Sequence, residues 1–219
     1  MAIVIERRFR GPDASGNGGY SAGLFARAFG AAEAEVTLRL PPPLEAPLDL
    51  DADGRVVHGE AVVAEVRAGK VEVAPPAPVS WAEAVAAEAP DLDSPFAECL
   101  VCGHARGEDG LHIHAGPVEG RGVHAAPWIV GDDAVGPEFV WAALDCPGAY
   151  ATGMFGRGTV VLGRLTARVD RVPGAGQECV VVAWPLGSDG RKHAAGTALF
   201  AASGDLLGIA SALWIEPRS

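Results

Sequence analysis

The chain repeats one order of predicted elements, and this internal duplication constrains its fold more than any other feature. In each half, an apolar segment with helical spacing is followed by several segments that alternate as strands do. The two helical segments begin near Gly18 and Pro137, which lie 119 positions apart in a chain of 219 residues. Such a repeat predicts two similar units that pack against each other.

The first unit is predicted to span residues 1–74. Met1 to Arg10 has the pattern of a strand, and Gly11-Pro12-Asp13 ends it. A helix is predicted from Gly19 to Phe29, with Gly30 as its C-cap. Strand patterns follow at residues 35–40, 56–66 and 71–73, with a hairpin-type turn at 51–54.

A linker at residues 75–98 leads to the second unit, which is predicted to span residues 99–219. The linker starts with prolines, and Ser80 and Glu83 have the spacing of a capping box that opens a short helix. The helix of the second unit begins at Pro137 and is predicted to reach at least Asp145. Its strand patterns cover residues 111–117, 123–130, 159–169, 178–184, 193–201 and 206–214.

Composition and charge exclude several classes of protein. The hydrophobic content of 49% is enough for a packed core, and no apolar run approaches the roughly 20 residues that span a bilayer. The net charge of −11 and the lack of a basic, aromatic-rich stripe argue against nucleic-acid binding. The first residues lack the pattern of a signal peptide. We therefore expect a cytoplasmic protein with no nucleic-acid or membrane partner.

The order of three motifs resembles that of the hotdog-fold thioesterase superfamily. The motifs are the glycine-pair helix at Asn17 to Phe29, Cys99-Leu100-Val101-Cys102-Gly103 before Gly110-Leu111-His112-Ile113, and Val140 to Asp145. The ending from Gly190 to Ile215 is similar to that of two-domain acyl-CoA thioesterases. The resemblance implies an α+β double hotdog, in which two long helices are each wrapped by a curved antiparallel sheet. The two sheets are expected to join across a pseudo-twofold axis.

The resemblance also implies a site shared between the units, because a helix start from one unit faces a helix carboxylate from the other. In such helices the acid lies about eight positions after the first glycine. Counting from Gly18 reaches Ala26, and counting back from Asp145 reaches Pro137. One composite site, made by Gly18, Gly19 and Asp145, would therefore be complete, while the reciprocal site would lack both a base and an N–H.

The chemistry of these residue types fits thioester hydrolysis. Free N–H groups of Gly18 and Gly19 at a helix N-terminus would stabilise negative charge on a carbonyl oxygen. Asp145 would act as a general base or as a nucleophile, and apolar neighbours such as Leu144 would raise its pKa. The structural alternatives are a capping or ion-paired Asp145 and glycines that only allow close packing.

Further candidates surround this core of the site. Thr159 would orient water, although an ordinary strand residue is the alternative. Arginines of the second unit would meet the phosphates of a nucleotide, with solvated strand faces as the alternative. The predicted substrate contacts are Asn17, Tyr20, Trp141, Arg157 and Arg191.

The cysteines allow a second interpretation. Cys99 and Cys102 have C-x-x-C spacing and, with two imidazoles, would make a tetrahedral zinc set. No second C-x-x-C is present, so we favour a structural turn and predict no metal. Cys146 and Cys179 are predicted to be core thiols. The histidines that would complete the zinc set are His104, His112 and His114.

The sequence therefore predicts hydrolysis of an acyl-CoA or related acyl thioester, without a cofactor. No nucleophile elbow, P-loop or dinucleotide fingerprint is present. The alternative from another class is a non-catalytic module that binds or senses acyl thioesters. Exposed sheet edges favour a homodimer of double hotdogs.

Overall fold

Helices and strands occur in two successive sets, as the duplication predicts. The computed structural model describes residues 2–89, 94–154 and 158–218. The helices are η1 (Arg7–Phe9, a 3-10 turn), α1 (Gly18–Phe29), α2 (Trp81–Ala87), α3 (Pro137–Ala143) and α4 (Cys146–Ala151). The strands are β1 (Glu33–Leu38), β2 (Asp49–Leu50), β3 (Arg55–His58), β4 (Ala61–Ala68), β5 (Gly116–Pro117), β6 (His124–Ile129), β7 (Val161–Val169), β8 (Glu178–Asp189), β9 (Lys192–Ala201) and β10 (Leu206–Ile215).

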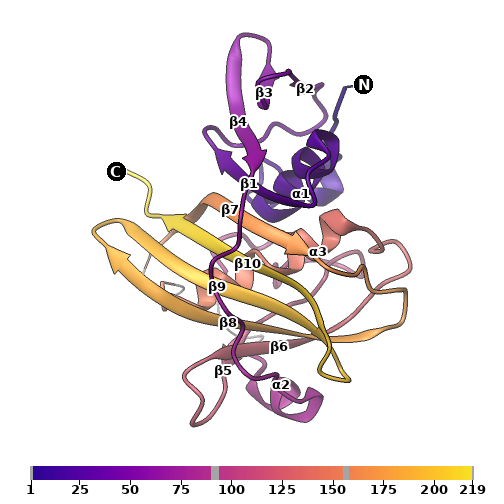
Figure 1. Ribbon diagram of the computed structural model, residues 1–219, viewed down its shortest axis with the longest axis vertical. Coiled ribbons are helices and arrows are strands. Elements are labelled where there is room, and N and C mark those ends of the chain that lie inside the picture. The colour runs from indigo at the N-terminus through magenta and orange to yellow at the C-terminus, as the bar shows by residue number, and fades with distance from the viewer. Residues whose placement is uncertain (1, 90–93, 155–157, 219) are drawn as a thin grey trace.

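A single sheet runs through both units (Figure 1). Its ten strands lie in the order β2-β3-β4-β1-β7-β10-β9-β8-β6-β5, and all of the pairings are antiparallel. The units meet where β1 pairs with β7, with Glu33 opposite Arg168 and Thr37 opposite Arg164. This pairing confirms that the two sheets join. Both edge strands, β2 and β5, are only two residues long, which leaves little free edge for pairing with a second chain.

Helices α1 and α3 pack against each other inside the curve of the sheet, and close packing requires small residues. Gly23 meets the backbone of α3, because a Cβ there would lie 2.7 Å from Glu138 Cα. The predicted helix and its cap are confirmed, since α1 ends at Phe29 and Gly30 has the left-handed φ of 81° that favours glycine.

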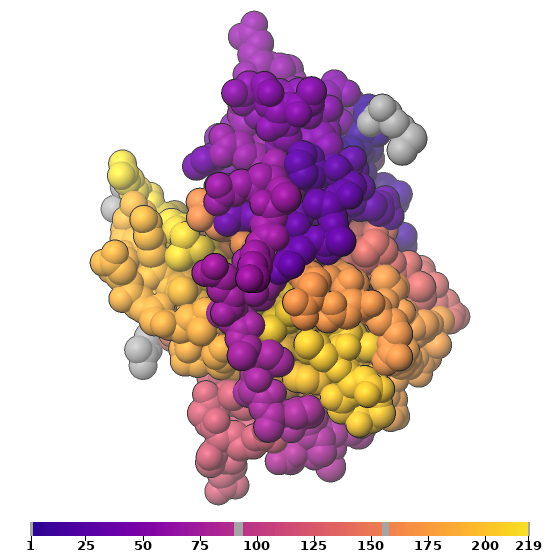
Figure 2. All heavy atoms as spheres, in the orientation of Figure 1, coloured from indigo at the N-terminus to yellow at the C-terminus, as the bar shows by residue number. Residues whose placement is uncertain are grey.

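The segment after β4 crosses the outer face of the sheet on its way to α2 (Figure 2). Val71 and Val79 from this segment, with Ala84 of α2, bury against side chains of β8, β9 and β10 in a second, smaller core. The capping box of α2 is present, because the Ser80 hydroxyl accepts from Glu83 N and the Glu83 carboxylate accepts from Ser80 N. The segment therefore ties the first unit to the second.

Two predicted strands of the first unit are absent. Met1 to Arg10 was expected to be a strand, but Arg7–Phe9 form a 3-10 turn and Ile3 makes only an isolated bridge to Leu48. Ile5 and Phe9 are buried in the core while residues 6–8 between them are exposed, so the side chains do not alternate as they do in a strand. Val71 to Val73 also lie outside the sheet, because they belong to the crossing segment.

The strand predicted at residues 111–117 shortens to β5. His112 has a φ of 51°, a left-handed conformation that a strand cannot contain. The amides of Leu111 and Ile113 instead donate to the carbonyls of Leu100 and Val101, at 2.8 and 2.9 Å. This loop thereby fixes the cysteine-containing turn that precedes it.

Within the described residues, none of the helices is long and apolar enough to cross a bilayer.

Candidate active site at the start of helix α1

Asp145 lies at the corner between α3 and α4. The predicted helix through Asp145 is too long by two residues, because α3 ends at Ala143 and α4 begins at Cys146. Pro147 has no N–H to donate to the carbonyl four residues before it, so a continuous helix would lose that bond. The resulting corner presents the Asp145 carboxylate to the first turn of α1.

Two donors from the first unit hold one oxygen of this carboxylate. The Gly19 amide donates to Asp145 Oδ2 at 2.8 Å, and Asn17 Nδ2 donates to the same oxygen at 3.1 Å. Asn17 is also the N-cap of α1, since its Oδ1 accepts from the Tyr20 amide at 2.9 Å. Asp145 is only 2% exposed, and its second oxygen, Oδ1, has no hydrogen-bond partner among the described residues.

Burial changes the acidity of Asp145. Loss of water around the carboxylate raises its pKa from 3.8 to about 7, despite the opposing hydrogen bonds from Gly19 and Asn17. Negative charge on the nearby Cys99 sulfur raises the pKa further. A carboxylate with a pKa near neutrality is suited to accept and return a proton at physiological pH.

The structure separates the roles of the two glycines. A Cβ on Gly19 would lie 2.5 Å from Asp145 Cβ, and the Gly19 N–H is already bonded to the carboxylate. Gly19 therefore positions Asp145 and has no N–H left for a substrate. The Gly18 amide has no hydrogen-bond partner among the described residues, and Gly18 lines a cleft. Of the two glycine amides, only that of Gly18 is therefore without a hydrogen-bond partner among the described residues.

A largely apolar cleft of about 290 Å³ opens beside these groups. Leu38 and Leu40 line it from the first unit, and Leu162 and Trp214 line it from the second. Asp145 forms part of the same wall. The cleft is therefore composite, with a polar end at the start of α1 and apolar walls of the kind that bind an acyl chain.

Three thiols gather at the polar end of the cleft. The sulfurs of Cys99, Cys102 and Cys146 all lie within 4.8 Å of one another, and Asn17 Nδ2 lies 3.6 Å from Cys99 Sγ. All three cysteines are buried and line the cleft. Their spacing would allow them to share one thiophilic ion. Cys146 is a core thiol, as predicted, and it also lines the cleft. Its position next to Asp145 in the sequence is the signal that would have placed it beside the candidate site.

The histidines of the alternative zinc set do not join these thiols. His104 and His112 are exposed, and the His112 ring bonds to the Gly107 carbonyl. His114 is buried, and its Nδ1 lies 3.9 Å from a carboxylate oxygen of Glu88. The alternative set of two thiolates with two imidazoles therefore does not come together among the described residues. Cys179 is buried within β8 and does not line the cleft.

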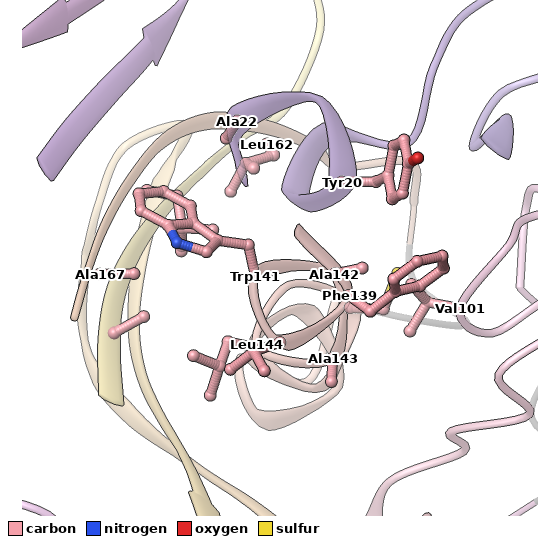
Figure 3. Close-up of a cluster of buried hydrophobic side chains, with 14 of the residues drawn as sticks. Tyr20, Ala22, Val101, Phe139, Trp141, Ala142, Ala143, Leu144, Leu162 and Ala167 are labelled. Carbon is pink, nitrogen blue, oxygen red and sulfur yellow. The ribbon is translucent and has the colours of Figure 1, made fainter. Parts of the chain in front are cut away.

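Tyr20 and Trp141 lie in the core and do not line the cleft (Figure 3). Tyr20 stacks on Phe9 with ring centroids 4.0 Å apart and meets the edge of Phe139. Trp141 points toward the sheet near Ala167, and its Cβ would be 2.9 Å from a Cβ on Gly23. Both side chains fill the space around the helix pair, and their contact with substrate stays a prediction.

The remaining candidates are distributed around the site. Thr159 is exposed and does not line the cleft, although its neighbour Val160 does. Arg191 is exposed, and its guanidinium donates to the Glu216 carbonyl at 2.6 Å, one residue beyond the cleft-lining Ile215. Arg157 lies outside the described residues.

The reciprocal position has a different set of groups. Ala26 is buried and carries no carboxylate, and Pro137 opens α3 without an N–H. Glu138, which matches Gly19 in the repeat, instead accepts from Arg27 Nη1 at 2.8 Å. An ion pair between the units thus stands where a second site would lie.

Comparisons with solved structures agree with this architecture at low sequence identity. No protein-family model and no curated protein matches the sequence. A "putative thioesterase" from Novosphingobium aromaticivorans aligns with a TM-score of 0.65 and 14% identity, covering 99% of this chain and 95% of that one. A hotdog-fold protein of unknown function from Alicyclobacillus acidocaldarius aligns with a TM-score of 0.61 and 12% identity, covering 98% and 91%.

A third full-length match is the tesB protein of Mycobacterium avium subspecies paratuberculosis. It aligns with a TM-score of 0.57 and 12% identity, covering 93% of this chain and 88% of that one. Each match spans both units and the sheet that joins them. The chain is therefore an α+β protein with the double hotdog fold.

Proposed function

We propose that this protein hydrolyses an acyl-CoA, or a related acyl thioester, at one composite site between its two units. The observation that carries this proposal is the 2.8 Å hydrogen bond from Gly19 of the first unit to Asp145 of the second, at the wall of an apolar cleft. Thioester hydrolysis needs a base, a donor for the carbonyl oxygen and a dry place for the acyl group. The cleft offers all three.

Each group around the cleft has one role in the proposed reaction. The acyl chain lies against Leu162 and the other apolar walls of the cleft. The carbonyl oxygen accepts a hydrogen bond from the N–H of Gly18, at the positive end of the helix dipole. Asp145 Oδ1, which lacks a partner, accepts the proton of the attacking group. The Gly19 and Asn17 donors keep Oδ2 fixed, so the carboxylate does not need to rotate.

The fold supports the same substrate class, since one full-length match is called a "putative thioesterase". The nucleotide part of CoA would extend out of the cleft, where Arg191 and Arg157 remain the predicted phosphate contacts. Thr159 remains a predicted water-orienting residue.

The test is a panel of acyl-CoA thioesters assayed by release of free thiol. Wild type is expected to turn over at least one acyl class, and Asp145→Ala to lose about 100-fold or more. Asp132→Ala, at an exposed aspartate, is the matched control and should keep the wild-type rate. Equal rates for wild type and Asp145→Ala would contradict the role of Asp145. Tight binding of acyl-CoA without turnover would favour the non-catalytic alternative.

A further inference from the structure

Cys99 has a different environment from the other thiols of the cleft. Asn17 Nδ2 lies 3.6 Å from Cys99 Sγ and 3.9 Å from Cys146 Sγ, so Cys99 is the closer of the two thiols to this donor, and the two sulfurs lie 3.8 Å apart. The Cys102 sulfur instead lies 3.5 Å from the Ser94 hydroxyl. Among the three clustered thiols, Cys99 is the one whose surroundings best stabilise a thiolate.

Cys99 is also linked to the proposed base. Asn17 Nδ2 lies 3.1 Å from Asp145 Oδ2 and 3.6 Å from Cys99 Sγ, so one amide nitrogen joins the carboxylate and the thiol. Gly18, which offers the carbonyl-binding N–H, lines the same end of the cleft as Cys99. A nucleophile, a base and an oxyanion donor therefore meet at one place.

The charges of this group favour transfer of one proton between two acids. Hydrogen bonds from Cys102 and Cys146 lower the pKa of the Cys99 thiol well below its ordinary value. The pKa of Asp145, about 7, lies closer to the ordinary pKa of a thiol than the pKa of an ordinary carboxylate does. Because both groups are buried, the site accommodates one negative charge better than two.

We propose that Cys99 is the acyl acceptor of this site, so that the reaction proceeds through an acyl-cysteine. This inference rests on the proposed thioester chemistry and names its nucleophile. The Cys99 thiol gives its proton to Asp145 through one intervening water, since no hydrogen bond joins the two side chains directly among the described residues, and its sulfur forms a bond to the thioester carbonyl carbon. The bond from that carbon to the CoA sulfur breaks, and the CoA thiolate takes the proton from Asp145.

A water molecule completes the cycle by the same route. Asp145 takes a proton from the water, the water oxygen bonds to the acyl carbon, and the carbon–Cys99 bond breaks. The Cys99 thiolate recovers its proton from Asp145, and a carboxylic acid leaves. The first step exchanges one thioester for another, so it costs little free energy and runs in reverse when CoA is present. Acyl exchange between CoA molecules is therefore a direct consequence.

The experiment measures both reactions in one mixture. Wild type is incubated with an active acyl-CoA and isotope-labelled free CoA, and mass spectrometry follows label entering acyl-CoA while thiol release follows hydrolysis. Wild type is expected to exchange label at least as fast as it hydrolyses. Cys99→Ala is expected to lose both rates by about 100-fold or more. Cys179→Ala, at a buried thiol away from the cleft, is the matched control and should retain both.

Acid-quenched samples then locate the acyl group, because a thioester survives acid and neutral hydroxylamine removes it. An adduct on the peptide that contains Cys99 supports the proposal. Hydrolysis by Cys99→Ala within threefold of wild type, or a stoichiometric metal ion bound by the thiols, would overturn it while the proposed hydrolysis stands. Label exchange without hydrolysis would support Cys99 as the acyl acceptor and reject the hydrolytic function. If wild type shows neither exchange nor hydrolysis, both the acyl-cysteine proposal and the proposed thioesterase function are rejected. Thermal melting checks folding, and Cys99→Ser serves if Cys99→Ala does not fold.

Discussion

Asp145 Oδ2 accepts a hydrogen bond from the Gly19 amide at 2.8 Å, although 126 positions separate the two residues. The amide belongs to the first turn of α1, where backbone N–H groups are free and the helix dipole is positive. The first unit thus supplies a donor that stabilises the ionised form of a carboxylate carried by the second unit. The acidity of Asp145 therefore depends on how closely α1 packs against α3.

Asp145→Asn should abolish most of the activity while preserving the local packing. The amide retains an oxygen for the Gly19 N–H but cannot accept a proton at neutral pH. We expect kcat to fall by about 10²-fold to 10⁴-fold. In wild type, kcat/KM should rise with pH through an apparent pKa near 7, the value for Asp145. A profile that stays flat from pH 5 to 9 would contradict this assignment.

The same substitution should change how stability depends on pH. The pKa of Asp145 is raised from 3.8 to about 7 in the fold, so between these values the folded chain binds more protons than the unfolded chain. Its contribution is fully present below about pH 4 and is lost as the pH rises to 7, which amounts to roughly 4 kcal/mol. Urea unfolding from pH 4.5 to 8 should show this decline for wild type relative to Asp145→Asn. Parallel curves for the two proteins would disprove it.

Gly19→Ala should affect catalysis more than a comparable change elsewhere in α1. Its Cβ would meet Asp145 Cβ at 2.5 Å and displace the carboxylate. Gly23→Ala is the matched control, because its Cβ would meet Glu138 Cα at 2.7 Å without touching Asp145. Both variants should lose about 1–3 kcal/mol of stability from overpacking. Only Gly19→Ala should also reduce kcat, by about tenfold or more, and similar kcat values for the two would refute the positioning role.

Changes at Asn17 should shift the pH profile. Asn17→Ser keeps an oxygen for the Tyr20 amide but loses the donor to Asp145, so the apparent pKa should rise by about one unit. Asn17→Asp also keeps the cap and adds a negative charge beside the carboxylate, which should raise the pKa further. The measurement is kcat/KM against pH. An unchanged midpoint in both variants would show that Asn17 does not tune the base.

Ala26→Asp should not create a second site. The new carboxylate would be buried without a partner N–H, because Pro137 has none, and should cost a few kcal/mol of stability. Ala28→Asp, at an exposed position on the same helix, should change stability by less than about 0.5 kcal/mol. A gain in turnover for Ala26→Asp would contradict the single-site arrangement.

Local patterns identified most of the elements, because short-range physics produces them. The glycine C-cap at Gly30 and the capping box at Ser80 were predicted from the sequence, since each satisfies backbone groups within one helix turn. Asn17 was predicted only as a substrate contact, and its role as the N-cap of α1 came from the structure. The strand predicted at Met1 to Arg10 was wrong because strand formation depends on contacts with distant parts of the chain. A strand needs continuous pairing, and the folded chain shows only an isolated bridge from Ile3 to Leu48 before the 3-10 turn begins.

The sequence by itself determined the duplication and the helix starts, because each follows from spacing along the chain, and the resemblance to hotdog-fold thioesterases set Gly18 and Gly19 opposite Asp145. The tertiary structure decided which of the two glycine amides remains free, and it placed Tyr20 and Trp141 in the core. It also brought Cys146 to Cys99, with sulfurs 3.8 Å apart. Such contacts join residues from different elements, and their geometry depends on how helices and sheet pack. No local pattern of residues carries that information.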